Sequence, residues 1–228
     1  LDSKNQNVQL SENPSISYDI LSINSGSISN HKNIKIDEIS NIISVKPINS
    51  FVKKLNFIDD IIEKSSKRKI SIIGGGVAAF ELSFALYKRY NGNVSLDIIS
   101  DQLLTEKNLN KSSINTLKKI AKNLNINFIS KKVITIKDSE ICLENKEKIQ
   151  SELILLSTGA SLPNWLAESN LEKSKNFITV NHHLQSLNYE NIFVSGDAAT
   201  IKNSKRAKSG VIAVRQGEVL RENLFLFL

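Results

Sequence analysis

The chain has 228 residues and a formal net charge of +7, a length that allows one large domain or two small ones. The basic residues are scattered among abundant Asn, Ile and Ser, as an A/T-rich gene would encode, so we expect no nucleic-acid partner. The single cysteine, Cys142, excludes an internal disulfide framework and a C-x-x-C redox pair.

Both ends of the sequence are typical of interior positions in a longer protein. The chain contains no Met, and residues 220–228 have a helical pattern with no stop signal. We therefore expect a fragment. The sequence contains no run of 18 apolar residues, so it predicts no membrane span. We expect the protein to be located in the reducing cytoplasm.

The N-terminal region predicts little regular structure. Residues 1–15 are polar and predict a loop or a strand remnant, and 18–23 predict a short apolar strand. Between 42 and 65, an extended element precedes Pro47, and an amphipathic helix then runs to about Glu63.

A glycine-rich turn between an apolar strand and a helix is the strongest signal in the chain. Lys69–Ile73 predicts a buried strand, and 77–90 predicts a helix. The pattern is G-x-G-x-x-A: Gly74 allows the tight turn, Gly76 lets the backbone approach a pyrophosphate, and Ala79 keeps helix and strand close. The alternative is a purely structural glycine turn. The predicted dinucleotide-binding residues here are Gly74, Gly75, Gly76, Val77, Ala78 and Ala79.

The remaining elements alternate in the manner of an α/β protein. Strand 94–99 and helix 109–124 come first, followed by short strands at 128–129, 132–137 and 140–144. A fully apolar strand at 152–157, strands at 178–180 and 192–194, and a helix from near Gly210 complete the chain. Apolar strands between helices predict a parallel sheet.

Two more strands end in small-residue motifs, Thr158-Gly159 and Gly196-Asp197. With the glycine turn, in this order, the chain resembles two-dinucleotide-domain flavoproteins, namely pyridine nucleotide–disulfide oxidoreductases and type II NADH dehydrogenases. Residues 18–27 look like the family's earlier strand and Thr-Gly element, with Asn-Ser in place of Ala-Thr. Residues 211–224 are similar to a helix of NADH dehydrogenase-like members that are often fused to a selenide, water dikinase domain.

The resemblance implies an α/β fold in which a Rossmann-like NAD(P)-binding domain is inserted in a partial FAD-binding domain. The expected boundaries are 1–50 and 161–228 for the FAD-binding parts and 51–160 for the NAD(P)-binding domain. The implied cofactors are FAD and NAD(H). The FAD-binding glycine motif of such proteins does not occur in this sequence, and we expect it upstream.

The resemblance also assigns roles to single residues. Asp197 would bind a ribityl hydroxyl of FAD, although a turn or N-cap role is the alternative. The helix that starts near Gly210 and Val211 would aim its N-terminus at the flavin. Glu81 would be the family's acidic residue near the nicotinamide. The alternative is that it is an ordinary exposed acidic residue in the first turns of a helix.

Coenzyme preference depends on the end of the second strand of the unit. Ser100 and Asp101 follow that strand, whereas Asp97 lies inside it. Asp101 is placed to bind the adenosine ribose, and no nearby Arg is available for a 2′-phosphate. The sequence thus favours NADH over NADPH.

Other features are given structural interpretations. Adjacent His182 and His183 point to opposite faces of a strand and have no partners at ligand spacing, so we expect no metal site. Trp165 either covers the flavin or packs on the sheet. The sequence contains no catalytic cysteine pair for disulfide reduction.

The sequence therefore predicts a FAD-dependent NAD(P)H oxidoreductase resembling type II NADH dehydrogenases. Hydride would pass from nicotinamide to flavin across the domain junction, and then to a quinone or a soluble acceptor. A quinone would bring the protein to the inner face of a membrane. The alternatives are a dinucleotide-binding regulatory module of a selenide, water dikinase fusion and a bare NAD-binding domain.

Overall fold

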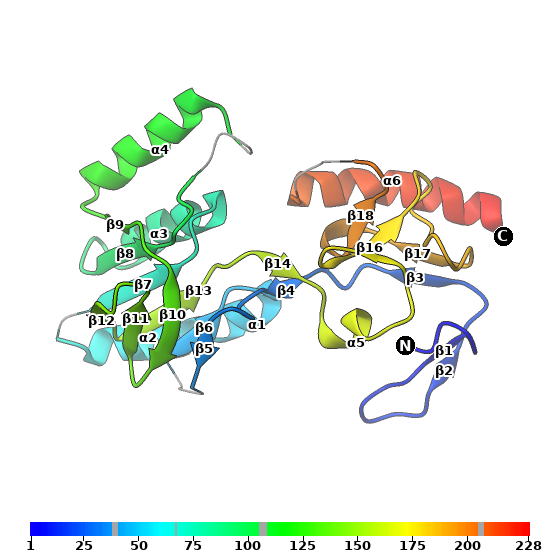
Figure 1. Cartoon of the computed structure of the whole chain (residues 1–228), viewed down its shortest axis with the longest axis horizontal. Coiled ribbons are helices and arrows are strands. Elements are labelled where there is room, and N and C mark those ends of the chain that lie inside the picture. Colours follow the sequence, from blue (N-terminus) through cyan, green and yellow to red (C-terminus); the bar gives the residue numbers. More distant parts are fainter. Residues whose placement is uncertain (38–40, 67, 105–108, 205–207) are drawn as a thin grey trace. The chain divides into compact units, whose positions relative to one another are not determined.

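The computed structural model describes residues 1–37, 41–66, 68–104, 109–204 and 208–228. The chain divides into two compact units: unit 1 is Leu1–Ile28 with Ala160–Leu228, and unit 2 is Ser29–Gly159 (Figure 1). One unit is thus inserted in the other, as the fold class predicts. The expected boundary after residue 50 differs from that of the compact units, because β6 (Ile42–Ser44) pairs within unit 2.

Unit 2 is built on a parallel sheet of five strands in the order β6-β13-β7-β8-β9. Its central members are β7 (Lys69–Ile73), β8 (Ser95–Ile99) and β13 (Leu153–Leu156), and β9 (Asn127–Ile129) is at one edge. The central strands are buried almost throughout because a sheet covered on both faces has no solvent-facing side: β13 is wholly apolar, whereas β7 contains buried Ser71 and β8 contains buried Asp97.

Alternation along the strands divides the side chains of this sheet between two cores. Ile70, Ile72 and Leu96 belong to the cluster that includes the helices. Their neighbours Ile73 and Ile99 belong to a second cluster with the antiparallel strands. Unit 2 therefore has three layers, with helices on one face of the parallel sheet and a second sheet on the other.

The helical layer contains α1 (Ile48–Lys53), α2 (Leu55–Lys64), α3 (Val77–Arg89) and α4 (Lys111–Asn123). The single predicted helix before residue 65 is broken at Lys54 into α1 and α2. Helix α4 begins at an N-cap, Asn110, whose side chain accepts a hydrogen bond from the Ser113 amide at 2.8 Å.

The second sheet of unit 2 has the order β12-β11-β10-β5. Its members are β5 (Lys35–Ile36), β10 (Val133–Lys137), β11 (Glu140–Leu143) and β12 (Lys148–Gln150). Strands β10, β11 and β12 form an antiparallel meander, and β5 joins β10 in parallel. Cys142 lies in β11, where a small apolar side chain was expected.

Unit 1 contains two short parallel pairings around its own core. Strand β3 (Leu21–Ile23) pairs with β17 (Ile192–Val194), and β16 (Phe177–Val180) pairs with β18 (Ala199–Ile201). Helix α6 (Gly210–Phe227) completes the unit, after a short 3-10 turn over Gly196–Ala198. The smaller elements are β1 (Asn7–Val8), β2 (Ile16–Ser17), α5 (Asn164–Ala167) and β15 (Lys173–Ser174). Strands β4 (Ile28–Ser29) and β14 (Ala160–Ser161) pair where the chain passes between the units.

A cluster of three polar side chains joins α2 to the end of α3. Arg89 donates to Asp59 through Nε and Nη2 at 2.9 and 2.6 Å, and the Tyr90 hydroxyl donates to the same carboxylate at 2.9 Å. The Arg89 hydrogen bonds lower the pKa of Asp59. Burial, and then the Asp59 carboxylate, raise the pKa of Tyr90.

Replacing Asp59 with Asn should lower the free energy of unfolding by about 1 kcal/mol at pH 7, a small effect because the pair is largely solvated. The pKa of Asp59 is lowered in the folded state, so its contribution exists above its ordinary pKa of 3.8 and is lost as pH falls further. Urea unfolding of both proteins at pH 7 and pH 3 checks this. A difference that stays constant or grows on acidification contradicts it.

Candidate functional site

Three adjacent glycines connect β7 to α3, and each meets a different neighbour. Gly74 has φ +129°, and a Cβ there would lie 2.2 Å from the Ser157 carbonyl oxygen. A Cβ on Gly75 would lie 2.2 Å from the Gln102 carbonyl oxygen. A Cβ on Gly76 would meet no atom of the described residues within 4 Å. Gly74 and Gly75 therefore make room for backbone atoms of neighbouring segments, whereas Gly76 borders space that the described residues leave open.

The N-terminus of α3 faces this open space with its backbone amides available. Gly76 is the N-cap in an extended conformation and has no side-chain cap. Within the described chain, the amides of Val77 and Ala78 make no hydrogen bond, whereas Ala79 donates to the Gly76 carbonyl at 3.1 Å. The fully buried Ala79 brings the helix close to the sheet, as predicted for the third position of the motif.

The loop after β8 lies against the glycine turn. The Leu104 amide donates to the Gly75 carbonyl at 2.9 Å, and the Ser100 hydroxyl accepts from the Gln102 amide at 3.1 Å. Asp101 is exposed in this loop. The structure thus brings Ser100 and Asp101 to the same edge of the sheet as the glycines, at the carboxyl ends of parallel strands, where α/β proteins bind ligands.

Thr158 and Gly159 follow β13 at this same edge. The Thr158 amide would lie 3.2 Å from a Cβ on Gly74, so the two turns are in contact. Among the described residues, the buried Thr158 hydroxyl has no hydrogen-bond partner, and the exposed Gly159 has open space around it. A buried hydroxyl without a partner is costly unless a ligand satisfies it.

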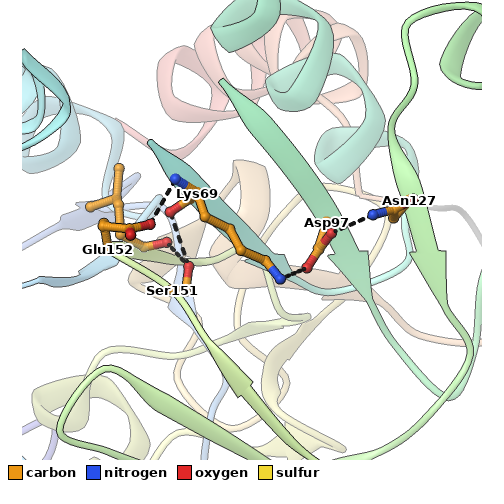
Figure 2. A network of polar contacts seen from close by, with 6 residues as sticks. Lys69, Asp97, Asn127, Ser151 and Glu152 are labelled. Atoms are coloured by element: carbon orange, nitrogen blue, oxygen red, sulfur yellow. Dashed lines mark hydrogen bonds and ion pairs between the residues drawn. The ribbon is translucent and has the colours of Figure 1, made fainter. Parts of the chain in front are cut away.

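Asp97 takes no part in this site. Figure 2 shows its side chain between Lys69 and Asn127, and it is only 1% exposed. Asp97 Oδ2 lies 2.9 Å from Lys69 Nζ, a charge contact without hydrogen-bond alignment, and Asn127 donates to Oδ1 at 3.1 Å. The Lys69 amide in turn binds the Glu152 carboxylate at 2.7 Å. This network holds the strands together.

Glu81 lies on α3 and is exposed. The structure gives it no hydrogen-bond partner among the described residues. Both interpretations of Glu81, as a residue near the nicotinamide and as a surface acid, remain predictions.

The Gly196-Asp197 motif forms a second candidate site, in unit 1. Gly196 has φ +69° and donates its amide to the Gln216 side chain on α6 at 2.7 Å. The Asp197 carboxylate accepts from the Ser27 hydroxyl at 3.2 Å. Because β3 pairs with β17, the two strands end side by side and bring Ser27 to Asp197.

A pocket opens at this turn, between it and the N-terminus of α6, and its lining includes Gly196, Asp197, Lys208, Ser209, Ile212 and Gln216. Ser209 is the N-cap of α6 and accepts from the Ile212 amide at 3.4 Å. Val211, in the first turn, is 64% exposed. Sequence reasoning missed the roles of Ser27 and Gln216, although the Ser25-Gly26-Ser27 turn after an apolar strand was a usable signal.

His183 and Trp165 belong to unit 1 and are not among the residues that line its pocket. His183 Nδ1 lies 3.0 Å from Asn223 Oδ1 on α6, and Trp165 on α5 is 42% exposed. Across the described ranges, His, Cys, Asp and Glu side chains form no group of three or more that could hold a metal ion. No helix among the described residues is long and apolar enough to cross a membrane.

The inserted Rossmann-like unit and the strand-end motifs define the class of two-dinucleotide-domain flavoproteins. The family model for pyridine nucleotide-disulphide oxidoreductases matches residues 1–217, and the chain belongs to that family.

Individual relatives are similar at a lower level. The chain is 29% identical over 159 residues to ferroptosis suppressor protein 1 of Taeniopygia guttata, covering 64% of the chain and 42% of that protein. It is 27% identical over 183 residues to an NADH oxidase of Mycoplasma pneumoniae, covering 75% and 37%. The chain thus spans about two fifths of the length of these relatives.

Solved structures show the same fold. A water-forming NADH oxidase from Lactobacillus brevis, bound to NADH, matches with a TM-score of 0.80 at 19% identity, covering 98% of this chain and 51% of that one.

Replacing Asp97 with Asn should lower the free energy of unfolding by about 2–3 kcal/mol, because it leaves the Lys69 ammonium without its charge partner. The affinity for ADP-ribose should not change, because Asp97 lies inside β8 and away from the glycine turn. Urea unfolding and calorimetric titration check the two parts, with Asp60→Asn on the exposed face of α2 as the control. Weakened ADP-ribose binding by a protein of unchanged stability contradicts this assignment.

Proposed function

We propose that the chain is the NAD(P)-binding and later FAD-binding part of a FAD-dependent NAD(P)H oxidoreductase, with NADH as the preferred reductant. The observation that carries the proposal is the space that the described residues leave open at Gly76, beside two amides at the start of α3 that have no hydrogen-bond partner among those residues. An electron acceptor, either a quinone or a soluble oxidant, would complete the reaction.

The residues of unit 2 fit a dinucleotide. The amides of Val77 and Ala78 offer donors to a pyrophosphate, and the described first turn of α3 contains no acidic residue that would repel it. Ser100 and Asp101 offer acceptors for the adenosine ribose. The buried Thr158 hydroxyl, which has no hydrogen-bond partner among the described residues, is a further group at the same edge that could bind the dinucleotide.

The residues of unit 1 fit part of a flavin cofactor. Asp197 presents a carboxylate to a polyol hydroxyl, and the Ser27 hydroxyl holds one of its oxygens. Gln216 fixes the Gly196 amide and so the position of the turn. The described first turn of α6 has no acidic residue, so its positive end is available to an anionic group.

When bound, FAD would accept a hydride from reduced nicotinamide and release electrons singly or in pairs to the acceptor. The protein's contribution is to bind both cofactors through backbone amides and fixed carboxylates and to exclude water. The hypothesis places Glu81 near the nicotinamide. Asp197, which lines the pocket of unit 1, would act as a binding residue for the flavin cofactor.

The similarity to an NADH oxidase supports the oxidoreductase proposal in general form. We propose a cytoplasmic protein that contacts a membrane surface if its acceptor is a quinone. A fused selenide, water dikinase domain remains a proposal that rests only on the resemblance of residues 211–224.

Replacing Gly76 with Val should slow flavin reduction by NADH about 100-fold or more, because the side chain would occupy the space proposed for the pyrophosphate. Stopped-flow absorbance of the complete flavin-loaded polypeptide measures this rate. A Cβ at residue 76 would meet no atom of the described part of the chain within 4 Å, so the thermal midpoint should stay near that of the wild type. An unchanged rate of flavin reduction in the folded variant would contradict the assignment of this site.

Replacing Asp101 with Ala should raise the Kd for NADH about tenfold, by loss of one hydrogen bond to a charged group. The Kd for NADPH should stay the same or fall, because a carboxylate repels a 2′-phosphate. Calorimetric titrations with both nucleotides check this, and Asp60→Ala on α2 controls for the loss of one negative charge. Equal changes for the two nucleotides would contradict a ribose contact.

A further inference from the structure

Gly75 occupies the variable position of the G-x-G-x-x-A motif, where pyrophosphate binding makes no demand for glycine. Its backbone is not in the left-handed region, so conformation does not demand glycine either. What excludes a side chain is space: a Cβ would lie 2.2 Å from the Gln102 carbonyl oxygen and 2.8 Å from the Ser100 hydroxyl.

The contact is between backbone and backbone, so it cannot be relieved by turning a side chain. The Leu104 amide also donates to the Gly75 carbonyl at 2.9 Å, and Leu104 is buried in the helical core. The loop 100–104 is therefore seated on the glycine turn at both of these points. Adding a methyl group at residue 75 must displace either the loop or the turn.

This loop carries the two candidate ligands for the adenosine ribose. Ser100 forms a local turn through the Gln102 amide, so the position of Gln102 sets the position of Ser100. Asp101 lies between them and is exposed. Their position relative to the pyrophosphate at Gly76 thus depends on how closely the loop approaches residue 75.

We propose that Gly75 is a positioning residue for coenzyme selectivity, which seats the loop 100–104 so that it discriminates a ribose 2′-hydroxyl from a 2′-phosphate. The inference rests on the proposed function, because it assumes that a dinucleotide binds at this edge. The inference gives each of the three glycines its own role. The missing side chain makes room for the residue after β13 at Gly74, for the loop 100–104 at Gly75, and for the ligand at Gly76.

The test compares Gly75→Ala with the wild type by calorimetric titration of the complete polypeptide with NADH and with NADPH. We expect the ratio of the two Kd values to move toward one by about tenfold, which corresponds to the loss of one charged hydrogen bond. Gly217→Ala, a glycine on α6 with open space around it, is the matched control and should leave the ratio unchanged. A merely structural defect would weaken the binding of both nucleotides equally and leave the ratio of the Kd values unchanged.

A second variant keeps the test decisive if Gly75→Ala does not fold. Leu104→Ala removes the buried side chain that anchors the same loop and changes no residue of the glycine turn, so it should move the ratio in the same direction. Wild-type selectivity in both folded variants, or in the one that folds, overturns the inference. Failure of the wild type to bind either nucleotide would instead overturn the proposed function, which makes the two failures distinguishable.

Discussion

The absence of a Cβ at two successive positions, Gly74 and Gly75, is the constraint on which unit 2 depends. The Ser157 carbonyl approaches Gly74 and the Gln102 carbonyl approaches Gly75 so closely that any side chain would collide with backbone. These approaches bring the ends of β13 and β8 together with the start of α3 at one edge of the sheet. In the described part of the chain, the third glycine leaves an open space beside two amides without hydrogen-bond partners, and this is where we propose that a ligand binds.

The parts of the fold that follow from burial were predictable from sequence. Strands β7, β8, β13 and β17 are rich in apolar residues and largely buried, as strands of a covered parallel sheet are. Short elements such as α5, β15 and β18 were not predicted, since two to four residues carry no periodic signal. The break between α1 and α2 at Lys54, and the inclusion of β6 in unit 2, depend on tertiary packing that the local pattern does not encode.

The candidate sites were predictable where a motif ends a strand, and not where two distant segments meet. The glycine turn, Thr158 and Asp197 are recognisable because chain geometry alone places them at strand ends. The Ser27–Asp197 bond joins residues 170 positions apart, so only the pairing of β3 with β17 reveals it. The requirement for glycine at residue 75 was not predictable either, because the Gln102 carbonyl oxygen that leaves no room for a side chain there belongs to another loop.

The most direct test of the account is an anaerobic titration of the complete polypeptide with NADH and then NADPH, following flavin absorbance. The account predicts that the protein binds flavin and that NADH bleaches it rapidly at near-stoichiometric amounts, with NADPH less effective. Bound flavin that neither nucleotide reduces would contradict the oxidoreductase and indicate a dinucleotide-binding regulatory module in its place.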